Sequence, residues 1–351
     1  MSINPLKIGN LIAKVPIIQG GMGVGVSLSS LAGNVAKQGA IGVISAAHPG
    51  YQEEDFEKNT LAANLRGLTK HIKKAKEISS NGIIGVNVMV AMNNYIEHVK
   101  TAIEAGADMI LSGAGLPLNL PEIAKGSSIK LAPIVSSSKA VKIILSYWKK
   151  HFNRTADAIV VEGPLAGGHL GFKKDKIEDA VVNFDKNILS VIEEVKNFEA
   201  EFNKKIPVIV AGGVFTHEDL TKYLKLGASG VQVATLFVAT HECDAHINFK
   251  NAFVNCKKED IEFTISPVGM PGRAIRNNLT ETLKSQKVKI TKCYDCLIPC
   301  NPGTTPYCIS SALIKAVKGD VENGLVFCGA NAYRINKIRS VQDVINSLMV
   351  G

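Results

Sequence analysis

Eight short apolar runs recur along the first two-thirds of the chain, and they limit the folds that it can adopt. Each run is nearly continuous in apolar residues instead of alternating, as expected of strands that are covered on both faces in a parallel sheet. Amphipathic stretches separate the runs, and the longest and most regular of these covers 186–202. We predict strands over 15–20, 40–46, 83–90, 108–114, 130–136, 158–163, 207–213 and 230–238.

Boundary signals and strand number together favour one fold class. The segment 27–39 begins with Ser27, an expected helix cap, and ends at Gly39. A second helix is expected to end at Gly227. Eight strands that alternate with helices predict a (β/α)8 TIM barrel. A doubly wound open sheet is the alternative, but residues 20–27 lack the third glycine of the dinucleotide-binding fingerprint at the right offset.

Residues 246–351 follow a different pattern. Two irregular segments punctuated by Gly and Pro, 266–277 and 293–308, are followed by short helix signals. We therefore predict two units: a barrel over 1–245 and, packed on its mouth, a mostly helical C-terminal extension that carries a Cys-rich loop.

Charge and hydropathy exclude several partners. The 351-residue chain has a net charge of +9, but its lysines are scattered without a helix-turn-helix, zinc-finger or RNP pattern, so nucleic-acid binding is not expected. No apolar run reaches the ~18 residues needed to span a bilayer, and the N-terminus lacks a signal-peptide pattern, which predicts a cytoplasmic protein. A positive surface would attract anionic substrates or a phosphate-bearing cofactor. The oligomeric state stays open, with a homodimer as one option.

Glycines gather where the predicted strands end, which is where barrel enzymes place their active sites. They favour the close approach of a flat or phosphorylated ligand to the backbone. The AGG sequence after the seventh strand also offers free N–H groups at a helix start, and barrels commonly hold phosphate between their last two loops. The residues in those two loops are Gly212, Gly213, Ala234 and Thr235.

A phosphate site of this kind predicts a phosphorylated cofactor. FMN fits it, together with the polar Asn87 and Gln232 inside the predicted barrel, although a sugar phosphate would fit the phosphate site equally well. Glu162, at the last inward position of the sixth strand, either binds cofactor hydroxyls or accepts local N–H bonds.

One histidine, His169, stands at a strand end directly after Gly167 and Gly168, with no carboxylate close to it in sequence. This placement favours a mobile, accessible imidazole. With an ordinary pKa of about 6.5 it would take a proton from a weakly acidic carbon, or donate a hydrogen bond to a developing oxyanion. The other histidines are expected at the surface or in the core.

The chain has seven cysteines, an odd number that argues against an extracellular disulfide framework. Four of them follow a C-x2-C-x3-C-x7-C pattern with prolines in between. Three or four converging thiolates would hold a metal ion or an iron–sulfur centre. The alternative is a group of reduced, partly buried thiols with no metal. The four candidates are Cys293, Cys296, Cys300 and Cys308.

Six separated motifs, in order along residues 10–280, carry a resemblance to a known family. They are PIIQGGMG, GVNV, AGGHLG, VIVAGGV, GASGVQVATLF and SPVGMPGRAIRN. Together they resemble the nitronate monooxygenases, also called 2-nitropropane dioxygenases, and share the pattern of the flavin-dependent enoyl-acyl-carrier-protein reductase II. Both families are FMN-binding (β/α)8 barrels, so the resemblance implies the same fold and cofactor here.

The resemblance also implies roles for individual residues. FMN contacts fall on the turn after the first strand, at Gly21, Met22 and Gly23, on Asn87, and on the phosphate motif at Gly212 and Gly213. The family histidine matches His169, as the base that deprotonates a nitroalkane or the residue that positions a nitronate. Three features depart from the monooxygenase pattern: Glu162 where many members have Gln, Ala234 where Gly usually precedes Thr235, and the Cys-rich segment.

Three functions follow as hypotheses. The first is FMN-dependent oxidation of alkyl nitronates, such as propionate 3-nitronate, by O2 to a carbonyl compound and nitrite. The second is NAD(P)H-dependent reduction of enoyl thioesters on acyl carrier protein, an acidic partner that a basic surface would suit. The third is a flavin- or metal-binding redox sensor whose cysteines respond to oxidants.

Overall fold

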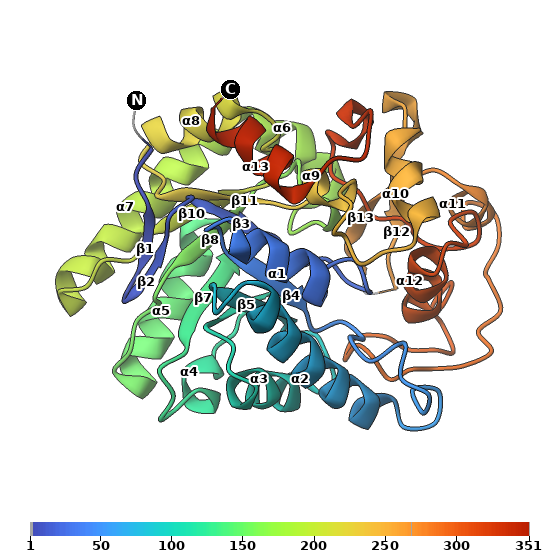
Figure 1. Cartoon of the computed structure of the whole chain (residues 1–351), viewed down its shortest axis with the longest axis horizontal. Helices are drawn as coiled ribbons and strands as arrows, with labels where there is room; N and C mark the ends of the chain where they lie inside the picture. The colour runs from blue at the N-terminus through green and yellow to red at the C-terminus, as the bar shows by residue number, and fades with distance from the viewer. Residues whose placement is uncertain (1–2, 268, 351) are drawn as a thin grey trace.

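The computed structural model describes residues 3–267 and 269–350, so Val268 of the SPVGMPGRAIRN segment lies outside the described part. Eight parallel strands form its centre, and each lies within one of the predicted runs (Figure 1). They pair in the order β3-β11-β10-β8-β7-β6-β5-β4, and a parallel bridge between Ile18 and Ile41 closes the ring. The prediction of a (β/α)8 barrel is confirmed. The strands are β3 (Ile17–Gln19), β4 (Gly42–Ser45), β5 (Ile84–Met89), β6 (Met109–Gly113), β7 (Lys130–Val135), β8 (Ile159–Glu162), β10 (Val208–Ala211) and β11 (Gly230–Val233).

Helices connect these strands and surround the barrel (Figure 1). Directly after β11 comes the short α9 (Thr235–Val238), so the second half of the run predicted as strand 230–238 is helical. The last helix, α13 (Val341–Met349), packs against α1, α8 and α9 and so fills the outer wall where an eighth barrel helix would lie. The other connecting helices are α1 (Ser29–Lys37), α2 (Thr60–Ile78), α3 (Tyr95–Glu104), α4 (Leu120–Ile123), α5 (Ser138–Phe152), α6 (Ile177–Val182), α7 (Phe184–Phe202) and α8 (His217–Lys225).

The barrel interior is filled by side chains and is closed at its N-terminal end. A hairpin of β1 (Leu6–Ile8) and β2 (Leu11–Ala13) contributes Leu6 and Ile8 to the same buried cluster as the inward-facing residues of the strands. This packing leaves the C-terminal end of the barrel as the place for a ligand.

The start of α1 is capped from a distant part of the chain. The Asp244 carboxylate accepts hydrogen bonds from the N–H groups of Leu28, Ser30 and Leu31 at 2.8–3.0 Å. Leu28, not Ser27, is the residue at the cap position, and no side chain caps α1 locally. The predicted serine cap is therefore wrong, because the Ser27 hydroxyl instead accepts from the Met22 N–H at 2.7 Å.

Replacing Asp244 by alanine is expected to lower the free energy of unfolding by about 1–3 kcal/mol, because three partly buried N–H donors lose their acceptor at once. Urea unfolding at neutral pH measures this change. Asp343→Ala, which removes an exposed capping carboxylate from α13, is the matched control and is expected to cost less. Equal losses for the two variants would contradict the importance of the remote cap.

The C-terminal segment combines helices with a small antiparallel sheet. Part of the segment predicted as irregular is a strand, β13 (Pro271–Ile275), which pairs with β12 (Ile261–Ile265) and with β9 (Gly168–His169). The boundary near residue 245 stays a prediction. The helices of this segment besides α13 are α10 (Ile247–Val254), α11 (Asn278–Thr282) and α12 (Ile309–Val317).

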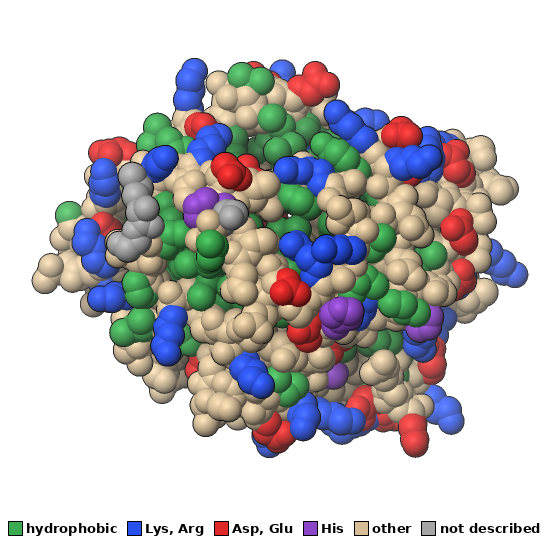
Figure 2. Space-filling view, turned by 45° about the horizontal axis from the view of Figure 1, so that its top comes forward, with side chains coloured by type: hydrophobic (Ala, Val, Ile, Leu, Met, Phe, Trp, Pro, Cys, Tyr) green, Lys and Arg blue, Asp and Glu red, His purple; other side chains and the backbone are tan. Residues whose placement is uncertain are grey.

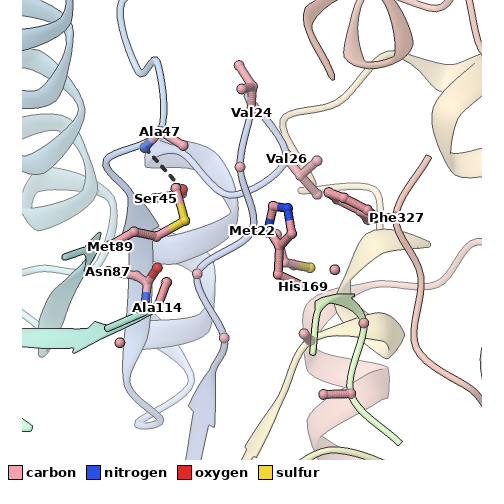
Figure 3. Close-up of a pocket in the computed structure, with 18 of the residues that line it drawn as sticks. Met22, Val24, Val26, Ser45, Ala47, Asn87, Met89, Ala114, His169 and Phe327 are labelled. Atoms are coloured by element: carbon pink, nitrogen blue, oxygen red, sulfur yellow. Dashed lines mark hydrogen bonds between the residues drawn. The ribbon is translucent and has the colours of Figure 1, made fainter. Parts of the chain in front are cut away.

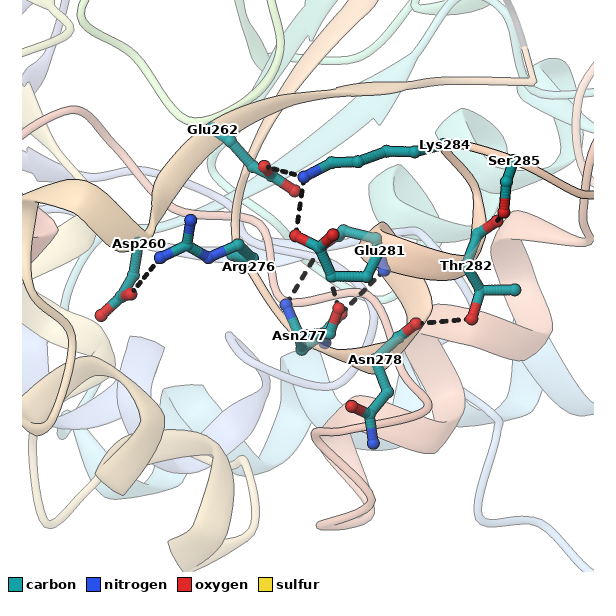
Figure 4. Close-up of polar contacts among 10 residues, drawn as sticks. Asp260, Glu262, Arg276, Asn277, Asn278, Glu281, Thr282, Lys284 and Ser285 are labelled. Atoms are coloured by element: carbon teal, nitrogen blue, oxygen red, sulfur yellow. Dashed lines mark hydrogen bonds and ion pairs between the residues drawn. The ribbon is translucent and has the colours of Figure 1, made fainter.

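Exposed ion pairs tie α11 to the hairpin (Figure 4). Lys284 lies 2.9 Å from Glu262 of β12 and 2.6 Å from Glu281 of α11, and Arg276 lies 3.0 Å from Asp260. Exposed pairs of this kind contribute little to stability, so the packing of α11 does not depend on them.

On the face shown in Figure 2, basic and acidic side chains are interspersed, and neither charge forms a large patch of its own. This distribution agrees with the scattered lysines of the sequence. Within the described residues, none of the helices combines the length and the apolar composition that a bilayer crossing would require.

Candidate active site

A cavity of about 840 Å³ opens at the C-terminal end of the barrel (Figure 3). Its walls come from the strand ends and from the C-terminal segment, including Phe327 and Asn331. The structure brings all the predicted cofactor residues and the predicted catalytic histidine to this one cavity. They are Gly21, Met22, Gly23, Asn87, Glu162, Gly167, Gly168, His169, Gly212, Gly213, Gln232, Ala234 and Thr235.

The turn after β3 crosses the cavity floor at very close range. A Cβ atom on Gly21 would lie 2.5 Å from the Cβ of Asn87, and one on Gly23 would lie 2.6 Å from the Cβ of Ala47. A side chain at these two positions would therefore collide with Asn87 of β5 or with Ala47, just after β4. The glycines keep this part of the floor flat, which suits a planar ligand.

The loops after β10 and β11 present free N–H groups to the cavity. Within the described chain, the N–H groups of Gly212, Gly213, Ala234 and Thr235 donate no hydrogen bond. Gly212 and Gly213 have φ values of +89° and +96°, a conformation that side chains rarely adopt. Converging unpaired N–H groups form an anion site, so this cradle fits a phosphate group.

Two residues outside the predicted set hold the cradle in place. The Asn331 side-chain amide donates to the carbonyl oxygen of Gly213 at 2.8 Å, and the Gly329 N–H donates to the Thr235 hydroxyl at 3.2 Å. The sequence did not predict the roles of Gly329 and Asn331. Nothing in the segment near residue 330 signals a contact with loops about 100 residues earlier.

Polar side chains on the cavity wall lack protein partners. The Oε1 atom of Gln232 is buried and has no hydrogen-bond partner in the described chain, and neither the Asn87 nor the Glu162 side chain makes a hydrogen bond there. Burial raises the pKa of Glu162 to about 7. A buried polar atom without a partner is costly, so Gln232 fits a bound ligand, and the half-buried Asn87 and Glu162 side chains can bond the same ligand from the cavity wall.

The raised pKa of Glu162 makes the stability of the ligand-free protein depend on pH. Between the unfolded value of 4.5 and the folded value of about 7, the folded state keeps a proton that the unfolded state releases. The contribution of Glu162 to the free energy of unfolding is fully present below pH 4.5 and is lost as the pH rises through about 7. Glu162→Gln, which keeps the neutral shape, should therefore gain stability over the wild type on going from pH 4.5 to pH 8, by on the order of 3 kcal/mol.

Urea unfolding of both proteins across this pH range measures the difference, and groups common to both cancel. Glu54→Gln, at an exposed carboxylate outside the cavity, is the matched control and should follow the wild type. Parallel stability curves for wild type and Glu162→Gln would show that Glu162 titrates normally.

His169 is held in place by a strand. It pairs with Gly272 through the β9–β13 ladder, its Nε2 atom lies 2.6 Å from the Ser266 hydroxyl, and its ring packs edge-on against Phe327 at 5.2 Å. Burial lowers the pKa of His169 to about 4, so the imidazole is neutral at pH 7. The expectation of a mobile histidine is wrong, because the C-terminal segment supplies a strand partner that the sequence did not reveal.

A family model described as nitronate monooxygenase matches residues 4–351 of the chain. The protein belongs to the nitronate monooxygenase family. The match extends over the barrel and the C-terminal segment alike. As a member of this family, the protein is a flavin-dependent oxidoreductase.

Individual relatives agree with this assignment. A probable nitronate monooxygenase from Staphylococcus aureus is 25% identical over 295 residues, which are 78% of this chain and 78% of the relative. The structure of FabK from Thermotoga maritima has a TM-score of 0.71 at 24% identity, covering 96% of this chain and 93% of FabK. Nitroalkane oxidase from Streptomyces ansochromogenes has a TM-score of 0.71 at 18% identity, covering 95% of this chain and 94% of its own. At these identities the two structures support the barrel fold alone.

Arg273 supports the histidine segment of this nitronate monooxygenase family member. Its guanidinium donates to the carbonyl oxygens of Pro164 and Ala166, just before β9, and lies 5.0 Å from the Phe263 ring centroid. Arg273 is 5% exposed and forms no ion pair with any described carboxylate. Backbone carbonyls thus satisfy its charge, and they fix the loop that leads into His169.

Two further histidines line the cavity of this family member. His48 and His98 are buried, as core histidines are, but both belong to the cavity wall. His48 bonds the Ser310 hydroxyl at 2.7 Å, and His98 Nδ1 bonds the carbonyl oxygen of Asn94 at 2.6 Å, while its Nε2 has no partner in the described chain. No motif marks either residue, because the cavity extends beyond the strand ends that the sequence could locate.

The cysteine cluster borders the same cavity. Cys293 and Cys296 line it, whereas Cys300 and Cys308 do not. Every cysteine is free. Within residues 3–267 and 269–350, no group of three or more His, Cys, Asp or Glu side chains is placed to hold a metal ion.

Proposed function

We propose that this protein uses FMN and O2 to oxidise alkyl nitronates to a carbonyl compound and nitrite. The observation that carries the proposal is the shared cavity: a neutral, fixed His169 and a cradle of free N–H groups line one space at the mouth of the barrel. The family supports the reaction class. The substrate is a small anionic molecule, and O2 is the second substrate.

The unpaired groups of the cavity indicate where FMN would be held. The N–H groups of the loops at Gly212 and Thr235 would bind its phosphate, and the flat floor at Gly21 would accept its ring system. The amide of Gln232 would hydrogen-bond the polar edge of the ring. When bound, FMN supplies the electron acceptor for the organic substrate and the site at which O2 is reduced.

The two proposed roles of His169 correspond to its two tautomers. If Nε2–H donates to the Ser266 hydroxyl oxygen, Nδ1 keeps a lone pair and can remove the α-proton of a neutral nitroalkane. If the Ser266 hydroxyl donates to Nε2, Nδ1–H becomes a donor that can hold a nitronate oxygen. The lowered pKa keeps the ring neutral and therefore makes both tautomers accessible.

Anaerobic mixing tests the proposal directly. The purified yellow protein is mixed in separate samples with propionate 3-nitronate, NADH and NADPH, and flavin bleaching is followed. We expect rapid bleaching by the nitronate, followed by return of the colour and release of nitrite when O2 is admitted. Rapid bleaching by a nicotinamide and none by the nitronate would overturn the proposal.

The same experiment serves the second candidate function, an NAD(P)H-dependent enoyl-acyl-carrier-protein reductase. The net charge of +9 favours it, since acyl carrier protein is acidic. Under this alternative, NADH or NADPH bleaches the flavin, and an enoyl thioester on acyl carrier protein restores the colour without O2.

A further inference from the structure

The cavity reaches past the strand ends, to a part of its wall that the proposed function leaves without a ligand. Five residues from three segments of the chain make up this part, which we call the outer wall: His48, Asn94, His98, Tyr294 and Leu297. Figure 3 shows His169 across the cavity from Ala47 and Met89, which lead into the first two of these segments. A substrate that contacts both His169 and the outer wall would therefore span the cavity.

A loop of the C-terminal segment holds the outer wall together. The Tyr294 ring lies 5.7 Å from the His48 ring, and a β-bridge joins Leu297 to Met92, in the connection between β5 and α3. The Tyr294 hydroxyl also donates to the Glu57 carboxylate at 3.1 Å. Because this loop contacts both neighbouring segments, the outer wall is formed before any ligand binds.

The ring of His48 has no hydrogen-bonding capacity left for a ligand. The Gly50 N–H donates to Oδ1 of Asn64 at 3.2 Å, which orients this amide and makes its Nδ2 the donor to Nδ1 of His48, also at 3.2 Å. Burial lowers the pKa of His48 to about 4, so the ring is neutral and carries its proton on Nε2. This Nε2–H donates to the Ser310 hydroxyl oxygen at 2.7 Å.

His98, in contrast, keeps one nitrogen free. Its Nδ1 lies 2.6 Å from the carbonyl oxygen of Asn94, which can only accept, so Nδ1 carries the proton. Burial lowers the pKa of His98, and the ring is therefore neutral at pH 7 with a lone pair on Nε2. His98 is 2% exposed, and its Nε2 has no hydrogen-bond partner within the described chain. A buried acceptor without a donor is unfavourable, so this nitrogen fits a donor that a ligand brings into the cavity.

We propose that Nε2 of His98 binds a neutral hydrogen-bond donor, a hydroxyl or an amide N–H, at the remote end of the substrate. The inference rests on the proposed function for the other end of the molecule, the nitronate group at His169. An alkyl end would leave the nitrogen unpaired, and a carboxylate end would bring a second acceptor toward it. A site that hydrogen-bonds a substrate hydroxyl discriminates strongly against analogues that lack it. His98 therefore selects nitronates that end in a hydroxyl or an amide.

Turnover of matched nitronates tests the proposal. Primary nitronates with chains from butyl to decyl are prepared with methyl, hydroxyl, carboxamide and carboxylate ends, and nitrite release is measured with the holoenzyme. At the chain length that reaches His98, kcat/KM should be at least about tenfold higher for hydroxyl and carboxamide ends than for the other two. The gain should come from KM, since a remote contact binds ground state and transition state alike. Equal kcat/KM for all four ends at every length would overturn the proposal.

Variants at one position show whether His98 causes the preference. His98→Phe keeps a ring but has no acceptor, so it should lose the preference for donor ends, whereas His98→Gln keeps an acceptor oxygen and should retain part of it. His71→Phe, at a histidine of α2 outside the cavity, is the matched control and should keep the full preference. Flavin content and thermal unfolding show whether each variant is folded. An unchanged preference in folded His98→Phe would contradict the role of His98.

A measurement without turnover separates this inference from the proposed function. Terminal hydroxycarboxylates of the same lengths carry a planar anion in place of the nitronate. The holoenzyme is titrated with them while the ring nitrogens of isotope-labelled histidine are observed by nuclear magnetic resonance, and the signal missing from His98→Gln identifies His98. The Nε2 resonance should shift as this nitrogen accepts a hydrogen bond, and the matching carboxylates without a hydroxyl should leave it unchanged.

The outcomes of this titration are distinct. If no length shifts the Nε2 resonance, or if a bound water already donates to Nε2 and no ligand displaces it, the role of His98 is wrong. If the hydroxycarboxylates shift the resonance but no nitronate reduces the flavin, the role of His98 is supported and the nitronate assignment is overturned instead.

Discussion

His169→Asn is expected to lower turnover of a neutral nitroalkane by about 10²–10⁴-fold, the usual contribution of a positioned general base. Asparagine keeps a polar side chain at this position of β9 but has no basic nitrogen. Turnover of the preformed nitronate, which has already lost the α-proton, should fall much less. Steady-state nitrite release from the two substrates measures both rates.

The ratio of the two losses distinguishes the tautomers of His169. A large loss on nitroalkane alone indicates that Nε2–H donates to Ser266 and that Nδ1 acts as the base. Equal losses on both substrates would contradict the base role and leave His169 as a donor to the nitronate. The matched control is His71→Asn, which removes a histidine that also bonds a serine hydroxyl, at 3.1 Å, but lies outside the cavity.

The pH profile gives a second measure of the same histidine. Burial lowers the pKa of His169 to about 4, so the imidazole stays unprotonated as the solution is acidified from neutrality. The kcat/KM for the nitroalkane, which reports the free enzyme, should therefore stay level down to about pH 5. A decline centred at an ordinary histidine pKa would show that His169 is more hydrated than its place in the structure implies.

The sequence was sufficient for the barrel because each strand is buried on both faces and therefore has a nearly continuous apolar pattern. That signal is local, and it located all eight strands. The features that it missed depend on contacts between distant segments. Asp244 caps α1, β13 pairs with β9, and α13 fills the place of an eighth barrel helix.

The same distinction separates the predicted site from the rest of the cavity. The glycines at the strand ends were predictable, because barrel topology brings those ends together and close approach requires glycine. His48, His98 and Asn331 were not, since each is an ordinary residue of its own segment and enters the cavity wall only through tertiary packing. Their roles in binding remain predictions.

Gly212→Ala is expected to weaken flavin binding by about 10–100-fold, or roughly 1.4–2.7 kcal/mol. Gly212 has φ +89°, and a Cβ atom there would lie 2.8 Å from the carbonyl oxygen and 3.0 Å from the nitrogen of Gly163. Backbone atoms of a buried strand end cannot move aside cheaply, so the loop should relax instead. Restoring the cradle for a phosphate then costs about 1–3 kcal/mol of backbone strain. Fluorescence titration of the flavin-free protein with FMN measures the affinity.

Gly106→Ala is the matched control for this variant. Gly106 has nearly the same φ, +88°, but nothing lies within 4 Å of a Cβ atom placed there, and it is not part of the cavity. Both variants should lose stability through backbone strain, whereas only Gly212→Ala should lose flavin affinity. If the two variants bound FMN equally well, the N–H groups of the loop after β10 would not hold the phosphate. The cofactor would then have to be anchored elsewhere in the cavity, because the cradle depends on the conformation that only glycine adopts readily at this position.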